Sequence, residues 1–144
     1  MNFNGEWAAI VIPLERNGGR TVCVYDETKP EPVYWKFSGG RRDKGRDMNS
    51  RETGSRELEE ETGLIVPQDE LFLLEEVNAR DHTRYFFGAY FDAEQLKSLK
   101  ERGDEGERIA VFTCDELLEA VDFFPSHRKV LEETMTRRKR YAVA

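Results

Sequence analysis

The sequence lacks the features that mark secreted, membrane-spanning or disulfide-stapled proteins. It has only two cysteines, Cys23 and Cys114, without spaced partners, so it suggests neither a zinc site nor a disulfide framework. Its longest apolar stretch, Ala8 to Ile12, is far too short to cross a bilayer. The N-terminal segment MNFNGEW has no basic region followed by an apolar run. We therefore expect no signal peptide and a cytoplasmic protein with two reduced thiols.

The chain has no excess of basic residues, since 29 Asp and Glu outnumber 22 Lys and Arg. The formal net charge is −7, which argues against a nucleic-acid-binding protein, because such proteins need a basic face. It does not argue against a small phosphorylated substrate, since a bound cation reverses the local charge. The 144 residues include nine Phe, five Tyr and two Trp, enough for a core, and we expect one domain over residues 1–144.

The hydrophobic pattern predicts a mixed α/β fold. Trp7 to Leu14 is typical of a buried strand, and the turn Asn17 to Gly19 predicts a hairpin with a second strand, Thr21 to Tyr25. Uneven alternation of strands and helices then predicts a mixed sheet with helices on both faces. Further strands are expected at Val33–Phe37, Leu71–Val77, Arg84–Phe91 and Ile109–Phe112, and helices at Glu94–Arg102, from Asp115 and from Pro125.

A central helix is expected between residues 49 and 62. Asn49 is a favourable N-cap, and Glu52, three residues on, is placed to answer it as in a capping box. Gly63 is the expected left-handed stop. The segment Arg56 to Leu64, RELEEETGL, therefore forms the C-terminal half of this helix and its end.

That half-helix gathers negative charge on one face. At about 100° per residue, Glu57, Glu60 and Glu61 fall within roughly a third of the circumference, whereas Glu59 points away. Like charges at i,i+4 cost roughly 0.2–0.5 kcal/mol, and acidic residues in a last turn oppose the helix dipole. Residues that break local rules together indicate a site. A hard divalent cation, Mg²⁺ or Mn²⁺, would offset this repulsion.

Acidic helix ends are usually no more than solvated surface, so the preceding segment matters. Trp35 to Gly40 reads as a strand that ends in Ser38-Gly39-Gly40. Glycines there would let a backbone carbonyl reach a metal and let the chain approach a phosphate. Arg41 and Arg42 flank the glycines, and they either contact phosphates or belong to a solvated loop.

These residues resemble the box of the Nudix hydrolase family, G-x5-E-x7-R-E-U-x-E-E-x-G-U, where U is a bulky aliphatic residue. The second half matches at every defined position, from Arg56 to Leu64. The order of elements over nearly the whole chain is also similar to the Nudix α/β/α sandwich with a mixed β-sheet. The resemblance implies a Mg²⁺- or Mn²⁺-dependent pyrophosphohydrolase in which water attacks a phosphorus of a nucleoside diphosphate linked to another moiety (NDP-X). It also implies that a homodimer is possible.

The resemblance assigns roles to particular residues. Glu57, Glu60 and Glu61 would hold the metal together with the Gly40 carbonyl, and Arg56 would support them. A further loop acid often completes such a site or acts as base. The matching place is the loop from Gly103, with Glu105 as first choice and Glu107 as second. Either Glu57 or Glu105 would be the general base.

The first half of the box departs from the family pattern. The sixth residue after Gly40 is Arg46, and the loop to Arg56 is two residues longer than the pattern. Counting back from Arg56 places Met48 where the pattern has Glu, although Asp47 could supply a carboxylate nearby. Ser38 also stands where similar sequences have Pro. The alternative is therefore a Nudix-like module that binds and senses a nucleotide without cleaving it.

The sequence does not identify the residues that would bind the rest of the substrate. One or two aromatic residues could stack on a base, and the sequence does not say which. His127 follows Pro125 at the start of the final helix, and we expect it to make a local hydrogen bond.

Overall fold

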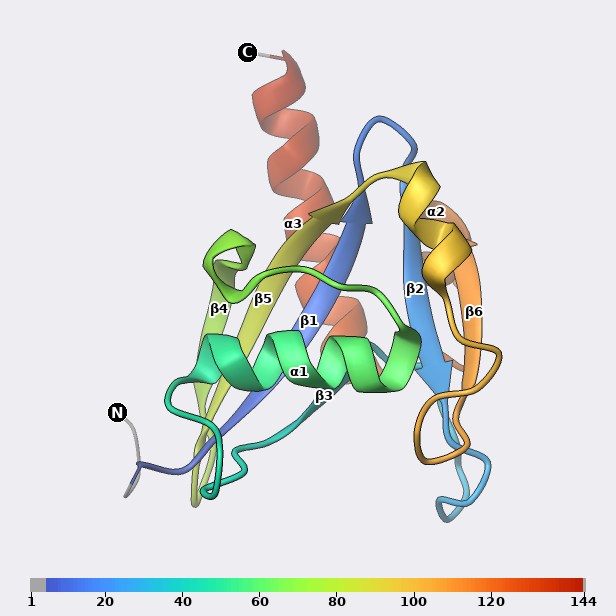
Figure 1. The fold of residues 1–144 in the computed structure, drawn as a ribbon. Helices are drawn as coiled ribbons and strands as arrows, with labels where there is room; N and C mark the ends of the chain where they lie inside the picture. Colours follow the sequence, from blue (N-terminus) through green and yellow to red (C-terminus); the bar gives the residue numbers. More distant parts are fainter. Residues whose placement is uncertain (1–4, 144) are drawn as a thin grey trace.

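The computed structural model describes residues 5–143, with side chains as far as residue 138. The chain alternates strands and helices in the uneven way expected (Figure 1). The strands are β1 (Trp7–Glu15), β2 (Arg20–Tyr25), β3 (Ser38–Arg41), β4 (Phe72–Asn78), β5 (Thr83–Phe91) and β6 (Arg108–Thr113). The helices are α1 (Ser50–Thr62), α2 (Cys114–Glu119) and α3 (Pro125–Val143), with short 3₁₀ helices η2 (Gln68–Glu70) and η3 (Ala93–Ser98).

The larger sheet is mixed, with strand order β3-β1-β5-β4. β1 runs parallel to β5 and antiparallel to β3, and β4 is antiparallel to β5. All nine residues of β1 are buried, as befits a central strand with a layer on each face. The expected pairing of the strands near residues 71–77 and 84–91 is confirmed.

The hairpin expected between the first two strands is wrong. β2 pairs with β6 in a separate two-stranded sheet, although a tight turn at Asn17 joins it to β1. β5 pairs along the whole of one edge of β1 and β3 pairs with Ala8 to Val11 on the other, so β1 has no complete edge left for β2. The turn is held instead by a side chain, since buried Glu15 accepts hydrogen bonds from the Arg20 guanidinium at 2.8 and 2.5 Å.

Helices cover both faces of the larger sheet, with α1 in front of it and α3 behind it in Figure 1. The burial of β1 alternates between these layers: Ile10 packs with Leu131 of α3, whereas Val11 packs with Leu58 of α1. Gly54 lets α1 approach closely, because a Cβ there would lie 3.0 Å from Val11 Cγ2. The expected α/β/α arrangement is thus confirmed.

Two segments differ from their expected form. The strand expected at Val33–Phe37 contributes only isolated bridges at Trp35 and Lys36, and the regular strand is β3. Lys36 exchanges two backbone hydrogen bonds with Val24 of β2, but its neighbours bond elsewhere, with Trp35 N donating to Asp122 O and Phe37 N donating to His127 Nδ1. The helix expected at Glu94–Arg102 is the shorter η3.

The expected ends of the central helix are confirmed. Asn49 Oδ1 accepts from Glu52 N at 2.9 Å, and Gly63 takes the left-handed conformation with φ 92° while its N–H donates to Glu59 O. α2 and α3 also begin at or next to the expected residues. Among the described helices, none combines the length and apolar character that crossing a membrane requires.

Candidate active site

The site forms where β3 passes α1. Gly39 N donates to Glu61 Oε2 at 2.9 Å, so the strand backbone holds a carboxylate of the helix. Gly40 lies against Glu57, and a Cβ at that position would come within 2.7 Å of the Glu57 carboxyl carbon. The two glycines of β3 therefore allow two helix carboxylates to lie directly on the strand backbone.

The three carboxylates expected on one helix face line one cavity of about 370 Å³. Glu59 is exposed and is absent from this lining, as the helical spacing predicts. Besides Glu57, Glu60 and Glu61, the cavity is lined by Asp26, Lys29, Lys36, Gly39, Gly40, Arg46, Arg56, Asp104, Glu105 and Glu107.

Burial and mutual repulsion perturb two of these acids. Burial, the negative charge of Glu57 and that of Glu107 raise the pKa of Glu61 to about 8, against partial opposition from the Gly39 hydrogen bond. Burial also raises the pKa of Glu57, helped by the charges of Glu60 and Glu105, although Arg56 opposes this shift. The protein alone therefore does not compensate the negative charge it concentrates here, and a cation would.

Arg56 is held from behind by Asp47. Its Nε and Nη2 donate to the two oxygens of the Asp47 carboxylate at 3.1 and 2.8 Å, a bidentate pair. Asp47 is 1% exposed and also accepts from Thr53 Oγ1 and Asp43 N, each at 2.8 Å. Burial alone would raise the pKa of Asp47, but these hydrogen bonds and the Arg56 charge outweigh it and lower the pKa to about 2.

Asp47 thus supplies the carboxylate behind Arg56, whereas the box pattern has its acid at the neighbouring position, residue 48. Met48 is 81% exposed and points away. The longer loop brings the neighbouring residue inward through a compact turn in which Asp47 N and Arg46 N both donate to Asp43 O. The sequence signal was only the nearness of Asp47 to the expected position. Arg46 is used as well, because its Nη2 donates to Glu60 Oε1 at 2.9 Å.

The free end of Arg56 meets the carboxylates. Its Nη1 lies 3.0 Å from Glu57 Oε1 and 3.2 Å from Glu60 Oε2. Within residues 5–143, accordingly, no three Asp, Glu, His or Cys side chains already surround one point as a metal would require. The donor set is one that Mg²⁺ or Mn²⁺ prefers, all oxygen and mostly carboxylate. Binding such an ion would require Glu57 and Glu60 to turn away from Arg56.

The acidic loop reaches the same cavity from the other side. Glu105 and Glu107 both line it, and Glu107 is buried with Oε1 accepting from Glu105 N at 2.9 Å. The loop is anchored on the C-terminal end of α1, where Asp104 N and Lys100 Nζ each donate to Glu60 O at 3.1 Å. These donors satisfy a carbonyl that the end of the helix leaves open.

The two arginines after the glycines differ in their surroundings. Arg41 lines a second cavity and lies 3.8 Å from Asp81. Arg42 lines none of the cavities described here. Its guanidinium lies 4.3 Å from the centre of the Trp7 ring and donates to Gly5 O and Asp47 O. These contacts hold Arg42 against the loop and the first strand, and its contact with phosphates stays a prediction.

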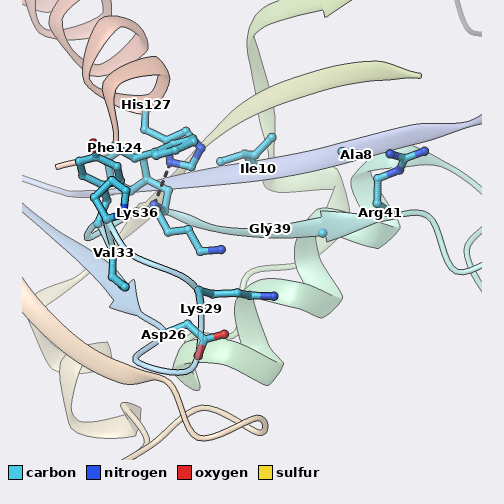
Figure 2. Close-up of a pocket in the computed structure, with 14 residues that line it drawn as sticks. Ala8, Ile10, Asp26, Lys29, Val33, Lys36, Gly39, Arg41, Phe124 and His127 are labelled. Carbon is cyan, nitrogen blue, oxygen red and sulfur yellow. Dashed lines mark hydrogen bonds between the residues drawn. The ribbon is translucent and has the colours of Figure 1, made fainter. Parts of the chain in front are cut away.

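The second cavity, of about 300 Å³, adjoins the first and is largely aromatic and aliphatic (Figure 2). Asp26, Lys29, Lys36, Gly39 and Gly40 line both. Its far end is closed by the rings of Tyr34, Phe124 and His127, with Phe124 and His127 in edge contact at 4.9 Å. No pattern in the sequence pointed to Asp26 or Lys29, which come from a loop far from the box.

A carboxylate-lined cavity beside an apolar one suits a small molecule that has a charged part and an apolar part. The comparisons with known proteins are specific. A model of the NUDIX domain matches residues 6–134, so the chain belongs to the NUDIX family. Membership implies pyrophosphohydrolase activity on NDP-X compounds. A comparison with curated proteins found no match.

Solved structures share the fold at low sequence identity. A structure from a study of MutT from the fish pathogen Aliivibrio salmonicida and from Vibrio cholerae has a TM-score of 0.68 at 17% identity, covering 92% of this chain and 98% of that one. A MutT/nudix family protein from Listeria innocua has a TM-score of 0.66 at 18% identity, covering 95% and 96%. The NUDIX domain of Shewanella oneidensis NrtR, complexed with ADP ribose, has a TM-score of 0.68 at 17% identity, covering 91% and 86%.

Proposed function

We propose that this chain is a single-domain, metal-dependent pyrophosphohydrolase that cuts the diphosphate of an NDP-X substrate. The observation that carries the proposal is the uncompensated cluster of carboxylates against a glycine strand, where Glu61 is held by Gly39 N and has a pKa raised to about 8. A structural role alone gives no reason to bury repelling acids at a helix end.

Glu57, Glu60 and Glu61 would hold Mg²⁺ or Mn²⁺, with the Gly40 carbonyl as a further ligand. Such a metal supplies charge neutralisation on the phosphate oxygens and acidifies a bound water. Arg56, fixed by Asp47, keeps Glu57 and Glu60 oriented before the metal arrives. Either Glu57 or Glu105 would take the proton of the attacking water.

The two adjoining cavities suggest how the substrate lies. The diphosphate would cross Lys29, Lys36 and the β3 glycines, which line both cavities. The nucleoside part would lie in the aromatic cavity, where Arg41 could reach an outer phosphate or sugar. No basic face suited to nucleic acid is needed for a ligand of this size.

A screen of NDP-X compounds with Mg²⁺ or Mn²⁺, followed through phosphate release after a coupled phosphatase, tests the proposal. The panel should hold nucleoside triphosphates, dinucleoside polyphosphates, nucleotide sugars and ADP-ribose, the last because one structural neighbour binds it. We expect metal-dependent release from one or two compounds. The double variant Glu60→Gln/Glu61→Gln should lose it, whereas Glu59→Gln, on the opposite side of the helix, should not. Equal rates in all three proteins would refute the proposal.

A second candidate is a nucleotide-sensing module without turnover. Its support is the ion pairing of Glu57 and Glu60 with Arg56, which a metal must first disrupt. It predicts metal and nucleotide binding with no phosphate release across the whole panel. Release that depends on Glu57 would exclude it.

A further inference from the structure

His127 is a histidine with only one of its two ring nitrogens used by the protein. Its Nδ1 lies 3.1 Å from Phe37 N, a backbone N–H that can only donate. Nδ1 is therefore the acceptor, and the proton of the neutral ring is on Nε2. Burial and the positive charges of Lys36 and Arg84 lower the pKa of His127 to about 3, so the ring keeps this tautomer across the physiological pH range.

The ring itself is fixed in position. It stacks on Phe37 at 5.8 Å with an interplanar angle of 12°, and it meets Phe86 and Phe124 edge-on at 5.7 and 4.9 Å. Three aromatic contacts and one hydrogen bond leave it little rotational freedom. Preorganised donors of this kind discriminate between ligands better than mobile ones.

The remaining donor has no protein partner. His127 is 6% exposed, and no described residue accepts a hydrogen bond from its Nε2. Nor is Nε2 among the fully buried unpaired atoms, so it keeps some access to solvent. His127 lines the aromatic cavity, and Figure 2 places its ring at the α3 end, beside Phe124. A ligand that covers this donor must accept from it, because otherwise the donor loses the hydrogen bond that it can make with solvent.

We propose that the Nε2–H of His127 reads a hydrogen-bond acceptor on the nucleobase of the substrate and so determines which base the enzyme takes. The inference rests on the proposed function, which places the nucleoside part in this cavity. The walls suit a flat heterocycle, with Tyr34 and Phe124 in ring contact at 5.7 Å and Ile10 and Val33 opposite the polar mouth.

A hydrogen-bond donor at Nε2 favours nucleobases that present an acceptor to it. A single fixed N–H rewards an unprotonated ring nitrogen or a carbonyl oxygen and penalises an N–H or C–H at the same place. A purely structural histidine accounts for the bond to Phe37 N, and the additional observation is a fixed N–H on a residue that lines a ligand-sized cavity. The His127 ring cannot act as a general base, because its one available lone pair is on Nδ1 and already accepts from Phe37 N.

Binding to the metal-free protein separates this inference from the hydrolysis proposal. Nucleoside monophosphates carrying the four common bases would be titrated by calorimetry, and the best would be compared with analogues in which one acceptor at a time is replaced by C–H. We expect one analogue to bind about tenfold more weakly than its parent. The variant His127→Asn, whose amide oxygen can still accept from Phe37 N, should weaken the parent about tenfold and lose the discrimination.

Proton-detected ¹⁵N spectra of the histidine rings give a readout that a structural role would not move. We expect an Nε2-protonated ring for His127 whose Nε2–H signal shifts with the parent base and not with the discriminated analogue. His82, the only other histidine, lies outside the cavity and serves as the internal control. The inference is overturned if no base binds, if every analogue binds like its parent, or if the Nε2–H signal ignores the ligand. In each of these cases phosphate release dependent on Glu60 and Glu61 could still be present.

Discussion

Replacing Glu61 by Gln should stabilise the metal-free protein while removing most of the stabilisation that Mg²⁺ or Mn²⁺ provides. The carboxyl of Glu61 has a pKa of about 8 in the folded protein, against an ordinary value of 4.5. Below pH 4.5 it is protonated in both states and costs nothing. As the pH rises from 4.5 to 8, the unfolded chain loses the proton and the folded chain keeps it, so the free energy of unfolding falls.

The size of this effect follows from the shift. Each pH unit in that window costs about 1.4 kcal/mol, so at pH 7 the metal-free protein loses about 3 kcal/mol through Glu61. Gln has no charge to desolvate, and its amide oxygen can still accept from Gly39 N. We therefore expect Glu61→Gln to gain roughly 1–3 kcal/mol at pH 7 and almost nothing at pH 4.5.

Urea denaturation at pH 4.5, 6 and 7.5, in chelator and again in saturating metal, measures both parts of this prediction. Glu59→Gln is the matched control, because it removes one charge from the exposed side of the same helix. The metal should raise the midpoint of the wild type and of the control far more than that of Glu61→Gln. The reasoning fails if the variant and the wild type show the same pH dependence in chelator, or if metal stabilises both equally.

Three further predictions follow from buried contacts. Asp47→Asn breaks a buried ion pair behind Arg56, so it should lower the free energy of unfolding, measured by denaturation, by about 2–4 kcal/mol. It should also lower kcat more than it changes KM. Met48→Ala, at the exposed neighbouring position, should change neither the stability nor the kinetic constants. Equal effects of the two changes would contradict the structure. Gly40→Ala should weaken metal binding measured by calorimetry, since its Cβ would overlap the Glu57 carboxyl, and unchanged affinity would argue against that contact. His127 by itself should lower the stability by up to about 1.4 kcal/mol per pH unit as the pH falls below 6.5, because the unfolded chain protonates it and the folded chain does not. This contribution opposes that of Glu61 over the same pH range, so His127→Asn should make the protein gain stability more steeply on acidification than the wild type does in denaturation experiments.

Local signals in the sequence predicted much of the fold. The cap at Asn49 and the stop at Gly63 depend on residues within one helix, and both are present. Strand pairing depends on competition between distant edges, which local patterns do not record. The first hairpin was therefore predicted wrongly, because β2 pairs with β6, more than eighty residues further along the chain, instead of with β1.

The residues of the candidate site also fall into those that local sequence patterns predicted and those that they did not. Helical spacing was enough to place three glutamates on one face and Glu59 off it. The loop lysine Lys29 and the ring of His127 come to the site only through tertiary packing, so their positions could not be inferred from spacing. Arg42 was expected near phosphates on sequence proximity alone, and its cation–π contact with Trp7 depends on where the N-terminal strand lies.

The buried carboxylate of Asp47 shows how a departure from the sequence pattern can leave the geometry of the site unchanged. The pattern of the box is written in sequence positions, but what Arg56 requires is an anion at one point in space. A loop that has grown by two residues satisfies that requirement from the adjoining position and releases the original one to an exposed methionine. In this chain the two extra loop residues therefore leave the anion beside Arg56 in place, although the acid is absent from the position that the pattern names.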